Sequence, residues 1–125
     1  MNDQPANILV VDDEKPIRRF LRASLQGHGY TVFEASSGQE AIQEATGHRP
    51  DVIILDLGLP DMDGTEVTRQ LREWTKVPII VLSVRDHESD KIAAFDAGAD
   101  DYLTKPFGVG ELMARIRVNL RRAIN

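Results

Sequence analysis

The sequence contains no cysteine, which excludes disulfide bonds and cysteine-ligated metals. It also has no excess of basic residues: 15 lysines and arginines stand against 20 acidic residues, a formal net charge of -5. This balance argues against nucleic-acid binding by this domain. Residues 1–6 carry no signal-peptide pattern, and no apolar run is long enough to cross a bilayer. We therefore predict a soluble, cytoplasmic domain that makes no membrane contact.

What the chain does have is a regular alternation of two patterns. Its 125 residues, 42% of them hydrophobic, suit one domain with a single core, spanning residues 1–125. Short apolar or β-branched runs predict strands, and each is followed by a stretch with apolar residues at helical spacing. The predicted strands cover residues 7–11, 30–34, 51–56, 78–83 and 102–104.

Five strand–helix repeats in a row predict an α/β fold, a parallel sheet with helices on both faces in a three-layer, flavodoxin-like sandwich. Five-stranded sheets of this type take the strand order 2-1-3-4-5. In that order the ends of the first and third strands are neighbours. Because open sheets place their chemistry outside the carboxyl ends of the strands, we expect Asp12, Asp13 and Asp56 to share one crevice.

Three carboxylates in one crevice repel one another, so the cluster indicates a positively charged partner. The segments that form the crevice contain no histidine or cysteine, and oxygen ligands alone favour a hard cation such as Mg²⁺. Lys105, after the last strand, adds an ammonium group, and Ser83, at the end of the fourth strand, adds a hydroxyl. This set suits phosphoryl transfer to a carboxylate, with Asp56 on the central strand as the nucleophile.

The chain resembles a response-regulator receiver domain, a family with the CheY-like fold. The resemblance rests on the following residues, which occur in this order: the pair Asp12-Asp13, Asp56, the loop LPDMDG at 59–64, Ser83, and the segment GADDYLTKPF at 98–107. It covers essentially the whole chain. The last segment is similar to the OmpR/PhoB subfamily, and among its members to the potassium-responsive Kdp regulators.

The resemblance implies that a sensor histidine kinase phosphorylates Asp56. Mg²⁺ would be ligated by Asp13, Asp56 and the backbone carbonyl of Gly58, with Asp12 acting through a water molecule. The domain would then be a signalling phosphoacceptor that catalyses only its own phosphorylation and dephosphorylation, and not an enzyme acting on other substrates.

The resemblance also implies a switch. Lys105 would pair with the phosphoryl oxygens, and its peptide bond to Pro106 is expected to be cis. The Ser83 hydroxyl would swing to bond the phosphoryl group, and the Tyr102 ring would turn inward behind it.

This change would reach the surface formed by the fourth helix, the fifth strand and the fifth helix, which is similar to the isologous homodimer surface of the subfamily. Lys91 would pair with Glu111 across the two-fold axis. Asp100 or Asp101 would pair with Arg115. The residues expected on this surface are Lys91, Ile92, Phe95, Asp96, Asp100, Asp101, Glu111, Met113, Arg115 and Arg122, with Ile92, Phe95 and Met113 as its apolar centre.

The C-terminal DNA-binding effector domain that the subfamily carries is absent from this chain, so control of transcription would belong to that part.

Two other functions remain open from the sequence alone. One is a pseudo-receiver that acts as a scaffold without phosphorylation; the intact set of acids, hydroxyl and lysine argues against it. The other is a phosphatase with an aspartate nucleophile, because Asp61–Thr65 fits the DxDGT signature of haloacid-dehalogenase-type enzymes. In that family the motif directly follows a buried strand, whereas here residues 57–60 intervene.

Overall fold

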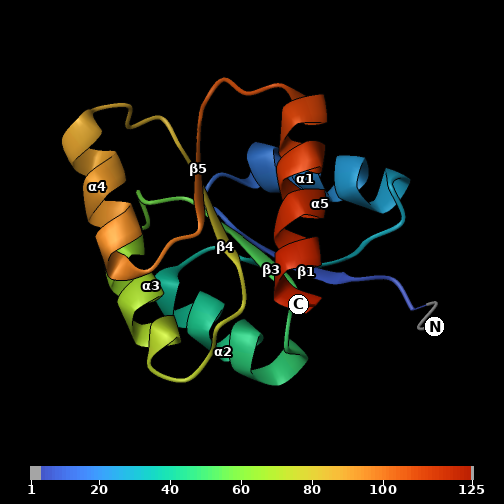
Figure 1. Ribbon diagram of the computed structural model, residues 1–125, viewed down its shortest axis with the longest axis horizontal. Coiled ribbons are helices and arrows are strands. Elements are labelled where there is room, and N and C mark those ends of the chain that lie inside the picture. Colours follow the sequence, from blue (N-terminus) through green and yellow to red (C-terminus); the bar gives the residue numbers. More distant parts are fainter. Residues whose placement is uncertain (1–3, 125) are drawn as a thin grey trace.

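The computed structural model describes residues 4–124, which form five parallel strands and five helices in strict alternation (Figure 1). The elements are β1 (Asn7–Val11), α1 (Lys15–Gly27), β2 (Thr31–Ala35), α2 (Gly38–His48), β3 (Val52–Leu55), α3 (Gly64–Arg72), β4 (Ile79–Ser83), α4 (Glu88–Ala97), β5 (Asp101–Thr104) and α5 (Val109–Ile124). The strand order is β2-β1-β3-β4-β5, which confirms the prediction. Within residues 4–124, none of the helices combines the length and apolar character that crossing a bilayer requires.

Helices cover both faces of the sheet. Figure 1 shows α1 and α5 together on one side and α2, α3 and α4 on the other. Alternate residues of the same strand enter different clusters: Ile54 packs with the α1–α5 side, whereas Ile53 and Leu55 pack with α2 and α3. Every residue of β3 and β4 is buried. This is why these strands are unbroken apolar runs rather than alternating patterns.

The third strand is shorter than predicted, so Asp51 and Asp56 flank it rather than belong to it. Two aromatic side chains near helices are about half exposed. α3 ends at Arg72, and Trp74 beyond it is 52% exposed. Phe20 of α1 is 50% exposed, although its ring lies 6.4 Å from that of Phe107.

Gly64, the first residue of α3, lies against the backbone that carries Asp56. A Cβ atom at this position would lie 2.7 Å from the Asp56 carbonyl oxygen and 2.7 Å from Leu57 Cα. Both neighbours are backbone atoms, so relief requires moving the loop between β3 and α3. The glycine therefore lets the helix begin directly beside the acidic crevice.

We expect Gly64→Ala to lower the free energy of unfolding by about 2–3 kcal/mol, as in an overpacked core. Urea denaturation measures this. Gly47→Ala is the matched control: Gly47 lies in the last turn of α2, where an added Cβ atom would have no neighbour within 4 Å, so the alanine should be neutral or slightly stabilising. If Gly64→Ala and the parent protein had equal urea midpoints, the loop between β3 and α3 would be able to move at little cost in free energy.

Candidate functional site

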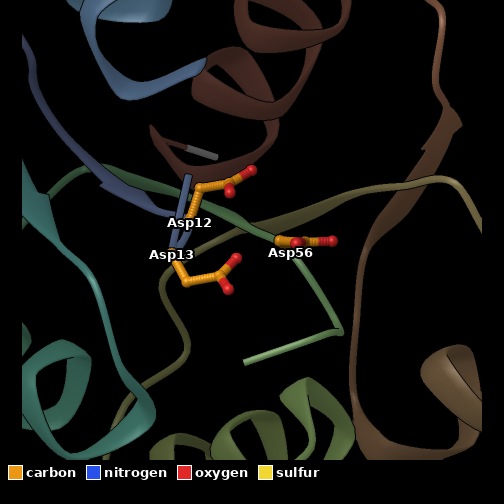
Figure 2. A group of neighbouring side chains, drawn as sticks. All are labelled: Asp12, Asp13 and Asp56. Carbon is orange, nitrogen blue, oxygen red and sulfur yellow. The ribbon is translucent and has the colours of Figure 1, made fainter. Parts of the chain in front are cut away.

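Three aspartates meet at the carboxyl end of the sheet (Figure 2). Asp12 and Asp13 directly follow β1, and Asp56 directly follows β3. The two strands are parallel neighbours, so their ends lie side by side. Carboxylate oxygens of the three residues lie within 4.8 Å of one another. The crevice expected from the strand order is therefore present.

Lys105 brings the positive charge into this cluster. Its ammonium nitrogen Nζ lies 3.0 Å from Asp12 Oδ2 and 3.8 Å from Asp56 Oδ2. Asp12 is 2% exposed and Asp56 is 8% exposed, whereas Asp13 lies at the surface. One ammonium group thus serves two buried carboxylates, with a third carboxylate at the mouth. The crevice keeps an excess of negative charge.

Asp56 is affected first by its burial and then by the charges around it. Burial raises the pKa of its carboxyl; Lys105 opposes that rise, and the nearby carboxylate of Asp12 adds to it, so the pKa lies above its ordinary value. Ionised Asp56 is therefore unfavourable in the crevice as it stands. A cation placed among the three carboxylates would remove this cost.

The donor set fits a hard divalent ion. The cluster offers three carboxylates, two buried and one exposed, and no nitrogen or sulfur ligand within the described residues. Mg²⁺ prefers one or two carboxylates together with water and phosphate oxygens, which an open mouth admits. The group can thus hold a metal ion. Gly58, the expected carbonyl ligand, lies two residues after Asp56 and forms an isolated β-bridge with Asp63.

The hydroxyl and aromatic residues of the predicted switch lie beside the crevice. Ser83 is buried at the end of β4, and its hydroxyl accepts a hydrogen bond from the Arg85 amide at 3.1 Å. Tyr102 is 8% exposed, and its hydroxyl donates to the Arg85 carbonyl oxygen at 2.6 Å. The Tyr102 ring is thus in the inward position. The Lys105–Pro106 peptide bond is cis, the form that the resemblance implied.

Three acids of the α4–β5–α5 surface, Asp100, Asp101 and Glu111, have partners within the chain. Arg115 donates to Asp101 at 2.8 Å and to Glu111 at 3.0 Å. Asp100 instead bonds to Arg72 of α3 at 2.6 Å, so Asp101 is the acid that lies next to Arg115. Any pairing of Arg115 across a two-fold axis would have to compete with these bonds.

Other residues of this surface are placed as follows: Ile92, Phe95, Asp96 and Arg122 are exposed, and the Lys91 ammonium lies 5.9 Å from the centroid of the Tyr102 ring. Met113 is different. It is 3% exposed and belongs to the core cluster between α5 and the sheet. Its predicted place in an exposed apolar centre is therefore wrong, because α5 turns this side chain toward the strands.

The DxDGT segment has a structural explanation. The Asp61 carboxylate accepts hydrogen bonds from the Gly38 and Gln39 amides at the start of α2, and these bonds hold its pKa below the ordinary value. Asp63 caps α3 by accepting from the Thr65 amide. Neither carboxylate belongs to the acidic cluster. The segment is thus a pair of helix caps rather than a phosphatase signature.

One contact beside the site was missed by sequence reasoning. The Arg85 guanidinium lies 2.8 Å from Asp63, which joins the loop after β4 to the loop after β3. Both residues lie in short irregular segments, where neither period nor spacing indicates a partner.

Comparison with known proteins agrees with this geometry. Residues 8–117 match the response regulator receiver domain family, and the chain belongs to that family. It is 65% identical over 116 residues to the KDP operon transcriptional regulatory protein KdpE of Escherichia coli K12, covering 93% of this chain and 52% of that protein. The chain spans about half the length of the curated relatives it matches.

Two solved structures have the same fold. The receiver domain of the Francisella response regulator 1452 is 35% identical, with a TM-score of 0.89 over 94% of this chain and 98% of that one. The BeF3-activated N-terminal receiver domain of RstA from Klebsiella pneumoniae is 31% identical, with a TM-score of 0.89 over 92% of this chain and 98% of that one.

Proposed function

We propose that Asp56 accepts a phosphoryl group from a sensor histidine kinase in a Mg²⁺-dependent reaction, and that the domain acts as a signalling switch rather than as an enzyme on other substrates. The observation that carries this proposal is the position of Asp56. It is a buried carboxylate that shares the Lys105 ammonium with Asp12 and belongs to a cluster able to hold a cation. The phosphoryl group carries negative charge and is attacked by the Asp56 carboxylate, which is also negative. The transfer therefore requires positive charge close to both groups.

Each residue then has a role. An Asp56 oxygen attacks phosphorus as the bond to the donor, a phosphohistidine nitrogen or the oxygen of a small acyl phosphate, breaks. Lys105 moves from Asp12 and Asp56 toward the phosphoryl oxygens, and the Ser83 hydroxyl bonds to one of them. Mg²⁺, when held by Asp13, Asp56 and the Gly58 carbonyl, with Asp12 acting through a water, would neutralise the remaining phosphoryl charge.

Phosphorylation itself is tested with acetyl phosphate and intact-mass spectrometry. In the presence of Mg²⁺ the protein should gain the mass of one phosphoryl group, and EDTA should prevent the gain. A chain that stays unmodified in Mg²⁺, or that is modified equally in EDTA, would contradict the proposal.

A separate prediction concerns metal binding without phosphorylation. Mg²⁺ at ten times its dissociation constant should stabilise the domain by about 1.4 kcal/mol, or about 5 °C in melting temperature. The reason is that the ion relieves repulsion among the three carboxylates. Thermal unfolding by circular dichroism measures the shift, and Asp13→Asn should reduce it. The titration is carried out in buffer free of Ca²⁺. If the melting temperature stayed unchanged up to high Mg²⁺ concentration, the cluster would not be a metal site.

We also propose that the domain is the cytoplasmic receiver part of a Kdp-type regulator, followed in the whole protein by a DNA-binding effector domain that controls potassium-transport genes. The support is the 65% identity to the Escherichia coli regulator of the KDP operon, of which this chain covers half. A chimera that joins this domain to the effector half of that relative should restore expression of the operon at low potassium. A chimera that is phosphorylated but silent would contradict the Kdp assignment alone.

The α4–β5–α5 surface is proposed to mediate a homodimer when Asp56 carries a phosphoryl group. Ile92 and Phe95 supply exposed apolar area there, and Lys91, Glu111 and Arg115 supply charge. We expect sedimentation velocity to show a shift from monomer to dimer on addition of beryllofluoride and Mg²⁺, and Phe95→Asp to prevent it. An unchanged monomer with fully occupied Asp56 would contradict the dimer proposal while leaving phosphorylation intact.

A further inference from the structure

Arg85 makes polar contacts through its backbone amide, its backbone carbonyl and its guanidinium group. Its amide donates to the Ser83 hydroxyl at 3.1 Å, its carbonyl accepts from the Tyr102 hydroxyl at 2.6 Å, and its guanidinium pairs with Asp63 at 2.8 Å. The residue lies in the short segment between β4 and α4. A single loop residue thus contacts the hydroxyl beside the crevice, the aromatic side chain of β5 and the cap of α3.

The Asp63 end of this chain of contacts is fixed. Asp63 caps α3, accepting from both the amide and the hydroxyl of Thr65, at 3.0 and 2.6 Å. Its backbone bridges to Gly58. The next residue, Gly64, is packed tightly against the Asp56–Leu57 backbone. Asp63 is therefore held by several local contacts, and the longer Arg85 side chain reaches it from another loop.

The Tyr102 end lies at the edge of the sheet. Within residues 4–124, β5 is the last strand, so its outer edge is not paired with another strand. The ring of Tyr102 contacts Phe95 of α4, with centroids 6.5 Å apart, and the Lys91 ammonium lies 5.9 Å from its centroid; Phe95 is exposed and Lys91 is partly exposed. The Arg85 carbonyl supplies the hydrogen bond that a buried tyrosine hydroxyl requires. Moving the loop away would remove that bond and favour a ring turned toward solvent.

We propose that the Asp63–Arg85 ion pair is the positioning element that holds the Tyr102 ring inward and the Ser83 hydroxyl in its bond to the Arg85 amide. The pair ties the loop after β4 to the fixed start of α3, and the Arg85 backbone passes this constraint to both hydroxyls. The inward position of the ring is therefore set in part by an interaction between two loops.

The chain offers a direct readout, because it contains only two tyrosines. With 3-fluorotyrosine incorporated, ¹⁹F NMR gives one resonance for Tyr30 and one for Tyr102, assigned with Tyr30→Phe. Asp63→Asn keeps an acceptor for the Thr65 amide but removes the ion pair. We expect it to move the Tyr102 resonance toward the solvent-exposed position, with a shift in the inward-to-outward ratio of about two- to fivefold, the range of a partly exposed ion pair.

The same shift should follow from Arg85→Gln, and the double variant should add nothing further, because both changes break one interaction. Arg85→Lys should restore much of the inward population, and 0.5 M NaCl, a concentration of about three times physiological ionic strength, should act like the variants. Arg69→Gln is the matched control, since it breaks the exposed Glu66–Arg69 pair on α3 without touching the loop. An unchanged Tyr102 resonance in Asp63→Asn, or additive effects of the two single variants, would overturn the proposal whatever the outcome of the phosphorylation tests.

Discussion

Replacing Asp56 by asparagine should lower labelling by acetyl phosphate by more than about 100-fold, because the amide has no carboxylate oxygen to form an acyl phosphate. The neighbouring carboxylates do not substitute for it in this account. Asp12 is bonded to the Lys105 ammonium and to the Glu14 amide, and Asp13 lies at the mouth of the crevice. The rate of mass gain in Mg²⁺ measures the effect.

Two controls separate loss of the acceptor from loss of the fold. Asp96→Asn removes an exposed acid of α4 and should label at the parent rate. Asp56→Asn itself should unfold at a higher urea concentration than the parent protein in metal-free buffer near neutral pH. Because the pKa of Asp56 is raised by burial, its ionisation opposes folding as the pH rises above the ordinary carboxyl pKa, and the neutral amide removes this cost. Labelling retained in Asp56→Asn would place the acceptor elsewhere.

Lys105→Gln should produce the second large effect. The ammonium lies between Asp12 and Asp56 and is the cation closest to the incoming phosphoryl oxygens in the proposed reaction. Removing one preorganised charge of this kind costs about 10²-fold in rate. We expect such a fall in the rate of labelling at saturating Mg²⁺, measured with acetyl phosphate as the donor.

Stability should fall as well. The change leaves the buried Asp12 carboxylate without its ammonium partner, and breaking a buried pair costs about 3 kcal/mol. Mg²⁺ should recover part of this loss, since it supplies positive charge to the same cluster. Lys76→Gln, an exposed lysine just before β4 at the opposite end of the sheet, should change neither rate nor stability. If the Lys105→Gln protein were labelled at the parent rate, Lys105 would have no role in the phosphorylation reaction.

The sheet and its acidic crevice could be predicted because both follow from simple rules. β3 and β4 are short unbroken apolar runs, which indicates strands covered on both faces. Once the strand order is fixed, residues that directly follow β1 and β3 must meet, and Asp12, Asp13 and Asp56 do. The position of each acid relative to the end of its strand is enough to place it in the crevice.

The remaining features depend on which elements touch, and the sequence does not show this. Met113 and Phe95 are both apolar residues of helices, yet one packs into the core and the other is exposed, because α5 and α4 present different sides to the sheet. The Asp63–Arg85 pair joins two separate loops, where no periodic pattern exists. Long-range polar contacts of this kind appear only when the backbone is known.

The identity of the phosphorylated residue tests the account most directly. The protein is incubated with acetyl phosphate and Mg²⁺, the acyl phosphate is reduced with borohydride, and the peptides are mapped by mass spectrometry. Reduction converts a phosphorylated aspartate into homoserine, and we expect homoserine at position 56. Homoserine at position 12 or 13 with none at 56, or phosphate found only on a hydroxyl such as that of Ser83, would contradict it.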